Sequence, residues 1–206
     1  MNTATSLRER KKLRTRQALI DTALDRFTER GFEATTLDEL CAAVEVSKRT
    51  FFRYFASKED VAMAPTQDLW AAFLDDLRTR EPSGTLLELY QETLLAALGR
   101  MPAEGWADRV LLSRRLAART PSMNAHGLQF CDRTTRAALD VLRQRFGLDD
   151  PHDPRPRLAL DMVVAAFHWA LEAWTFHPER GDRDDLAGRL RDAFAALPGT
   201  VAMTVA

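Results

Sequence analysis

The sequence predicts an all-α protein of about nine helices, with a small N-terminal domain and a larger C-terminal helical domain. Three observations support this prediction. Apolar residues recur at helical spacing along nearly the whole chain. Several of these runs are preceded by a serine, threonine or aspartate of the kind that starts helices. Alternating strand patterns are almost absent. We expect the two domains to cover residues 1–57 and 58–206.

The composition is that of a globular protein with a locally basic start. Of its 206 residues, 46% are hydrophobic and 29% are charged. The formal net charge is -1, yet six Lys or Arg and one Glu lie between residues 7 and 16. We interpret this segment as a basic arm on an otherwise neutral protein, the alternative being a solvated tail.

Two cysteines, Cys41 and Cys131, lack the spacing of a zinc site and are too few for a disulfide framework. Cys41 is expected to be a small buried apolar residue. No apolar run approaches the roughly 18 residues of a membrane span, and the polar N-terminus lacks a signal-peptide core. We therefore expect a cytoplasmic protein without a metal or a cofactor.

The N-terminal domain is expected to contain three helices. The first covers residues 8–30 and ends at Gly31, a C-cap residue. Its expected apolar face consists of Leu13, Ile20, Leu24 and Phe27. The second helix begins after Thr36, which forms a capping box with Glu39. The third begins after Ser47 and runs to about Tyr54.

Six further helices are expected in the C-terminal domain. Their predicted ranges are 58–80, 85–100, 104–119, 122–146, 157–176 and 182–197. Pro65 predicts a kink or break at residues 61–65, and we hypothesise that it acts as a hinge. The helix over 157–176 is apolar nearly all round, which is typical of a core or an interface. Pro198 and Gly199 are expected to end the last helix.

Two short helices joined by a tight turn, the second with a polar and basic start, are how many proteins present a helix to the DNA major groove. Here the turn is Val44–Val46 and the second helix opens with Ser47–Thr50. Lys48 and Arg49 can donate to guanine or to phosphate, and for Arg49 a purely phosphate role remains open. The starts of the second and fourth helices suit phosphates. Phe51 and Phe55 should face inward.

Residues 13–61 resemble the DNA-binding domain of the TetR family of transcriptional regulators. The resemblance is carried by Phe27–Phe32, by Thr35 and Thr36, by Val46–Phe55, and by Ser57–Asp60. The resembling region, residues 13–61, covers about 50 residues. The rest of the chain resembles the family only in its layout of several helices followed by two long apolar ones.

This resemblance implies a set of DNA-contacting residues: Thr36, Ser47, Lys48, Arg49, Thr50, Phe52, Arg53, Tyr54 and Lys58. Three positions depart from the family pattern. Glu45 occupies a turn position that is often glycine, at a cost of roughly 1 kcal/mol if its φ is positive. Phe52 lacks the hydroxyl of the tyrosine often found there. Arg49 replaces a residue that is often glycine, which makes it our candidate for base readout.

The resemblance also implies a homodimer, formed through the last two helices, that binds double-stranded operator DNA and is released by a small-molecule effector. The candidate dimer contacts are Ala166, Trp169, Ala170, Trp174 and Phe194. The candidate lining of a largely apolar effector pocket is Trp70, Phe73, Tyr90, Trp106, Met123, Phe130, Phe167 and His168. Each of these residues could instead belong to the core.

Other functions have weaker support. The chain has no Gly-rich phosphate loop, no Gly-x-Ser-x-Gly and no His-Glu-x-x-His, so we do not expect an enzyme. An effector-independent DNA-binding protein that acts through protein partners remains an alternative, and a C-terminal core without a cavity would favour it. We expect a repressor, and activation of transcription is the alternative, because the sign depends on where the operator lies relative to the promoter.

Overall fold

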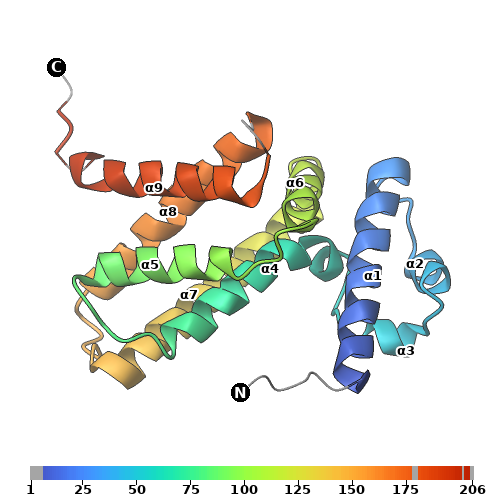
Figure 1. The fold of residues 1–206 in the computed structure, drawn as a ribbon, viewed down its shortest axis with the longest axis horizontal. Coiled ribbons are helices and arrows are strands. Elements are labelled where there is room, and N and C mark those ends of the chain that lie inside the picture. Colours follow the sequence, from blue (N-terminus) through green and yellow to red (C-terminus); the bar gives the residue numbers. More distant parts are fainter. Residues whose placement is uncertain (1–6, 178–180, 201, 205–206) are drawn as a thin grey trace. The chain divides into compact units, whose positions relative to one another are not determined.

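The computed structural model describes residues 7–177, 181–200 and 202–204, and these ranges contain nine α-helices and no β-strand (Figure 1). The all-α prediction is confirmed. In chain order the helices are α1 (Leu7–Arg30), α2 (Leu37–Ala43), α3 (Lys48–Phe51), α4 (Lys58–Leu77), α5 (Leu86–Gly99), α6 (Trp106–Ala117), α7 (Pro121–Phe146), α8 (Arg155–Phe176) and α9 (Arg183–Thr200).

Three helix boundaries differ from the expected ones. The third helix ends at Phe51, and residues 52–54 continue as a turn. The break expected at residues 61–65 is wrong, because α4 runs through Pro65 as one helix. Pro198 likewise lies inside α9, which ends at Thr200. Each of these prolines lies inside its helix and removes one backbone hydrogen bond there, and the remaining hydrogen bonds of the helix continue on both sides of it.

The described chain forms two compact units, whose division does not coincide with the expected boundary after residue 57. The first unit contains residues up to Pro65 together with 109–127, and the second contains residues 66–108 and those from Leu128 onward. The reason is visible in the first unit's core. Ala62 of α4, Leu116 of α6 and Met123 of α7 are buried in the same apolar cluster as the helices of the N-terminal domain.

The core of the first unit is built around α1. Ile20, Leu24 and Phe27 are buried as expected, whereas Leu13 is 61% exposed and lies outside the core. The buried face of α1 therefore begins at Leu19, six residues or nearly two turns further along than expected. Phe51 and Phe55, separated by 5.7 Å between ring centroids, are both buried. They attach α3 to this core, as their spacing predicts.

In the second unit α8 packs against α9, and both contact α5 (Figure 1). The buried face of α8 includes Leu160, Val163, Phe167 and Trp174. The indole N–H of Trp174 donates to the carbonyl of Asp182, 3.1 Å away, at the turn into α9. Within the described ranges, no helix combines the length and the apolar character that a membrane span requires.

Candidate nucleic-acid interface

The cap of α2 is the predicted capping box. The amide of Glu39 donates to the Thr36 hydroxyl over 3.3 Å, and the amide of Thr36 donates to the Glu39 carboxylate over 2.8 Å. The Thr36 hydroxyl also donates to that carboxylate. The hydrogen bonds from the Thr36 amide and hydroxyl lower the pKa of Glu39. Thr36 is therefore fully used within the protein, although it is exposed.

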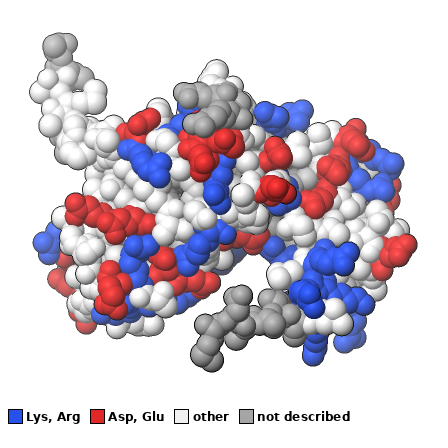
Figure 2. Space-filling model, viewed as in Figure 1, with Lys and Arg blue, Asp and Glu red and all other residues white. Residues whose placement is uncertain are grey.

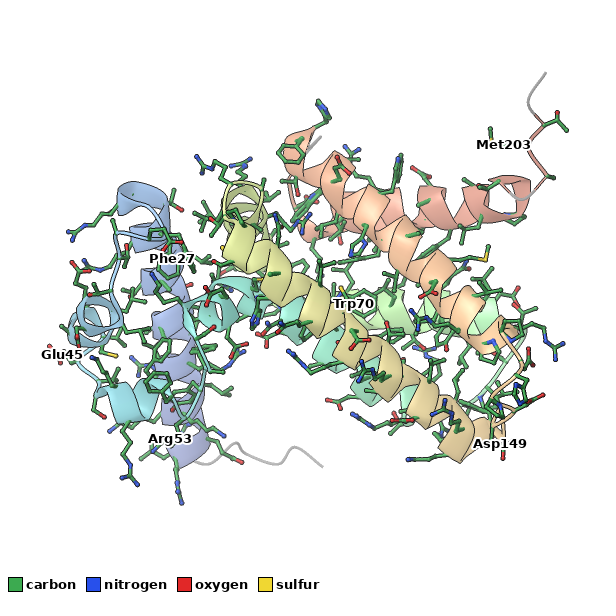
Figure 3. All side chains as sticks on the ribbon, turned by 180° about the vertical axis from the view of Figure 1, so that it is seen from behind. Phe27, Glu45, Arg53, Trp70, Asp149 and Met203 are labelled. Carbon is green, nitrogen blue, oxygen red and sulfur yellow. The ribbon has the colours of Figure 1, made fainter. Side chains whose placement is uncertain are left out.

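The turn from α2 to α3 is a Schellman motif with a non-glycine residue at its strained position. The amide of Val46 bonds to the carbonyl of Cys41 at 2.9 Å, and the amide of Glu45 bonds to the carbonyl of Ala42 at 3.2 Å. Glu45 has φ +53° and is the single non-glycine residue with positive φ in the described chain (Figure 3). The sequence had predicted a cost at this position if φ were positive.

Helix α3 starts at the predicted cap. The Ser47 hydroxyl accepts from the amide of Thr50 at 3.1 Å, and the two side-chain hydroxyls lie 3.0 Å apart. Because Phe51 is buried on the opposite side, the outer surface of this short helix is polar and open to solvent. The side chains exposed there are Ser47, Lys48, Arg49, Phe52 and Arg53, with Thr50 and Tyr54 half-buried beside them.

Two aromatic features shape this surface. Phe52 is 54% exposed and meets the buried Phe51 ring edge-on at 5.6 Å. Its exposed ring adds an apolar surface beside the polar side chains of α3. The guanidinium of Arg53 lies 5.6 Å from the centroid of the Tyr54 ring. Figure 3 shows Arg53 at the edge of the first unit.

Lys48 and Lys58 make contacts that the sequence did not predict. Lys48 pairs with Asp38 of α2 at 2.9 Å, across the helix-turn-helix. Both partners are largely exposed, so the pair adds little stability and can exchange for a phosphate. Lys58 donates to the carbonyls of Phe32 at 2.8 Å and Thr35 at 3.0 Å, and its ammonium lies over the Phe32 ring. One of its three donors is left for a phosphate.

Cys41 is buried in the first unit's core at 4% exposure, in the place expected for a small apolar side chain. Burial raises the pKa of its thiol, which keeps it protonated at neutral pH. A protonated buried thiol is a poor nucleophile and a poor metal ligand.

The sequence analysis placed no individual residue of α1 in this surface. Arg8, Lys11 and Lys12 of α1 line one open groove together with Thr50 and Arg53 of the α3 region. Figure 2 shows the resulting cluster of basic side chains over the start of α1 and over α3. The run of basic residues signalled it, but the groove depends on how α1 and α3 pack, which the sequence pattern does not give.

A second candidate site is an apolar cavity inside the second unit. Trp70 and Phe73 of α4 meet edge-on at 5.2 Å, and Phe167 of α8 meets Trp70 at 5.1 Å. The cavity volume is about 10 Å³, enough for a single water molecule. Its lining consists of Trp70, Phe73, Phe130, Cys131, Thr134, Thr135, Ala138, Leu160 and Val164.

Three of the eight predicted pocket residues, Trp70, Phe73 and Phe130, line this cavity. Phe167 contacts Trp70, and Tyr90 lies beside Phe73 with 6.2 Å between ring centroids. The other three do not line it. Met123 belongs to the first unit's core, Trp106 is buried elsewhere in the second unit, and His168 is exposed. Apolar spacing marks a residue as buried but does not say which neighbours it meets.

The Tyr90 hydroxyl is buried without a hydrogen-bond partner in the described structure. Burial and the negative charge of Asp161 both raise the pKa of this tyrosine. An unpaired buried hydroxyl carries an uncompensated desolvation cost, so it is a candidate donor for a bound molecule near Phe73.

Of the predicted dimer contacts, Trp169 alone is exposed, at 56%. Ala166, Ala170, Trp174 and Phe194 are buried within their own chain and have no surface to offer a partner. The outward face of α8 instead carries Leu158 and Phe176, at 55% and 54% exposure, with Ala165 between them. At 100° per residue these positions fall on one line with Trp169, so α8 has an apolar stripe on its outer face.

A short, capped recognition helix exposed on a rigid three-helix core, followed by a larger helical unit, defines a helix-turn-helix DNA-binding protein. The family model for "Bacterial regulatory proteins, tetR family" matches residues 19–64. Over 166 residues the chain is 37% identical to the HTH-type transcriptional regulator TcmR of Streptomyces glaucescens, spanning 78% of this chain and 71% of that protein. The chain belongs to the TetR family of transcriptional regulators.

Other relatives agree with this assignment. The chain is 27% identical over 143 residues to the "Probable acrEF/envCD operon repressor" of Escherichia coli K12, covering 66% of this chain and 58% of that one. The structure of Thermus thermophilus FadR, a TetR family repressor in complex with lauroyl-CoA, superposes with a TM-score of 0.54. It shares 21% identity over 93% of this chain and 97% of that one, a similarity of fold. These proteins are regulators of transcription and not enzymes.

Proposed function

We propose that this protein is a transcriptional repressor that binds a palindromic operator as a homodimer and is released from it by a small molecule. The observation that carries the proposal is the exposed, polar surface of α3 on a buried aromatic anchor, in a chain of the TetR family. Relatives named as repressors support the sign of regulation.

In this proposal Arg49 reads bases, because it is exposed in the first turn of α3 and has no counterpart in the common family pattern. The other eight predicted contacts position the helix. Among these, Thr36 and Lys58 are engaged with their own chain, so they act mainly by fixing the start of α2 and the loop after α1. Contacts from the remaining residues to DNA phosphates set the register of the helix on the duplex and carry no sequence information directly.

The homodimer is proposed to form through the apolar stripe of α8. A two-fold axis brings the same stripe from both copies together, so one self-complementary surface is sufficient. Replacing Trp169 by Glu should turn a dimer into a monomer at micromolar concentration, as measured by sedimentation or light scattering. Leu128→Glu is the matched control, since Leu128 is 74% exposed and belongs to α7, not to α8. A dimer that survives Trp169→Glu would place the interface elsewhere.

The effector is proposed to be a largely apolar small molecule that enters the cavity lined by Trp70, Phe73 and Phe130. With room for about one water molecule, the cavity must open before a ligand can bind. Thr134 and Thr135 are polar residues in its lining, and the buried Tyr90 hydroxyl belongs to a ring that lies beside Phe73.

One observation favours the second candidate function, an effector-independent regulator acting through protein partners. A cavity of about 10 Å³ is close to a solid core, which an effector-independent protein would have. The two functions separate in a release assay. Apolar compounds that dissociate the protein from its operator, and lose this effect in Ala138→Phe, support the effector. Release by none of a broad set supports the alternative.

The first test of the proposal is selection of bound duplexes from a random DNA pool with the purified protein, repeated across a salt series. Recovery of an inverted repeat, with half-sites about one helical turn or more apart, would support a dimeric sequence-specific regulator. Recovery of no motif, with binding lost by physiological salt, would overturn it and leave only electrostatic attraction.

A further inference from the structure

The start of α1 is a helix that makes almost no use of the protein's core. All eight residues from Leu7 to Arg14 are exposed. Five of them are basic: Arg8, Arg10, Lys11, Lys12 and Arg14. The core contacts of α1 begin only at Leu19. Apolar packing within the described chain therefore does not stabilise these two turns.

The basic residues of this segment differ from most arginines in the second unit. There, arginines pair with aspartates three or four residues away, such as Arg78 with Asp75 and Arg157 with Asp161. Within the described part of the chain, none of the five basic residues at the start of α1 forms an ion pair with a carboxylate. Their charge is available to an external partner.

The charge arrangement also opposes helix formation in the free protein. Arg8 and Lys12, and likewise Arg10 and Arg14, are like charges at i,i+4, which repel on a helix surface. Positive charge in the first turns also opposes the helix dipole. A polyanion along this helix would remove both penalties at once.

Position identifies that partner. Arg8, Lys11 and Lys12 line one groove together with Thr50, Arg53 and Tyr54 of the α3 region (Figure 2). Glu9 is the one acidic residue in this lining, so the three basic residues of α1 and Arg53 give the groove a net positive charge. The backbone of a nucleic acid that contacts α3 would therefore also pass along the start of α1. Arg10 and Arg14 line a second open groove on the adjacent face of the helix, beside Val44, and Lys11 lines both grooves.

We propose that the first two turns of α1, Leu7–Arg14, form a second DNA-contacting element, which binds phosphates flanking the half-site and is stabilised as a helix by them. This inference rests on the proposed operator binding by α3. It assigns the segment a role in affinity and salt dependence, with base preference left to α3.

The test uses Arg8→Ala/Lys12→Ala in the full chain, on the operator recovered by selection. Alanine is the best helix former, and its introduction removes a repulsive pair, so folding of α1 is preserved. Each lost phosphate contact lowers the slope of log K against log salt by about 0.9, so two contacts lower it by about 1.8 per chain. The preference for operator over a scrambled duplex should stay unchanged.

The matched control is Arg115→Ala/Arg133→Ala, which removes the same charge from exposed positions of α6 and α7. It should leave the salt slope unchanged. A second readout is amide hydrogen exchange of residues 11–16, whose N–H groups have helical partners; it should slow severalfold on operator DNA.

The outcomes distinguish the two proposals. Wild-type operator binding with an unchanged slope in Arg8→Ala/Lys12→Ala overturns the α1 contact and leaves the proposed function standing. Equal slope losses in the test and control variants also overturn it, since they reflect net charge alone. Failure of the wild-type protein to prefer any duplex overturns both.

Discussion

Replacing Glu45 by Gly should stabilise the protein, because Glu45 is a side-chain-bearing residue in the left-handed region at φ +53°. The steric cost of such a conformation is about 1–2 kcal/mol for an L-residue. Glycine removes that cost but loses about 0.5–1 kcal/mol through the greater freedom of the unfolded chain. The expected net gain in the free energy of unfolding is therefore about 0.75 kcal/mol, the middle of a range of about 0–1.5 kcal/mol.

Urea unfolding at a fixed protein concentration measures this gain. With a slope of about 2 kcal/mol per molar urea, the midpoint should rise by about 0.4 M. Glu45→Ala is the control, since alanine keeps Cβ and removes only the carboxylate. Both variants retain the two backbone hydrogen bonds of the Schellman turn, which the amides of residues 45 and 46 donate. A glycine variant no more stable than the alanine variant would refute the strain argument.

Four further predictions concern the site and the second unit. Arg49→Ala should cost roughly 1–3 kcal/mol of operator affinity and relax base preference at one position, measured by titration of single-base operator variants; equal loss on every sequence would leave a phosphate role. Tyr90→Phe should raise the free energy of unfolding by about 1 kcal/mol, because it removes a buried hydroxyl without a partner, and a lower stability in urea would mean that the hydroxyl has one. Thr85→Ala should cost about 1 kcal/mol through loss of the α5 capping box, whereas Thr85→Ser should not. Hydrogen bonds from the Thr85 amide and hydroxyl lower the pKa of Glu88. The stability that they add is therefore complete above the ordinary glutamate pKa and is lost as the pH falls through the lowered pKa of Glu88. The free energy of unfolding of Glu88→Gln should lack this acid dependence.

The helix starts and the anchor of α3 could be predicted because they depend on neighbours in sequence. Thr36 with Glu39 and Ser47 with Thr50 are contacts three residues apart, and their residue types are specific to helix caps. Phe51 and Phe55 follow from helical spacing. For Glu45 the sequence predicted a steric cost if φ is positive, because the family often has glycine at that position.

What could not be predicted depends on packing between distant segments. Lys58 meets carbonyls of residues 32 and 35 across a gap of more than 20 residues, and no local pattern signals that contact. The burial of Ala166 and Trp174 within their own chain had the same cause. A helix that is apolar all round has two faces to cover, and the sequence does not say which covers which. Burial data assign Trp169 to the outer face of α8.

The near-solid core around Trp70 has a consequence for the rate at which a regulator of this kind responds. A molecule can enter this cavity only after the lining side chains have moved. Its observed association rate should therefore reach a plateau at high concentration of the molecule, and the plateau equals the rate at which the cavity opens. Its apparent dissociation constant is the intrinsic one divided by the open fraction. A variant that enlarges the cavity, such as Phe130→Ala, should therefore raise the association rate at which this plateau is reached. Its effect on the dissociation rate of the bound molecule should be smaller.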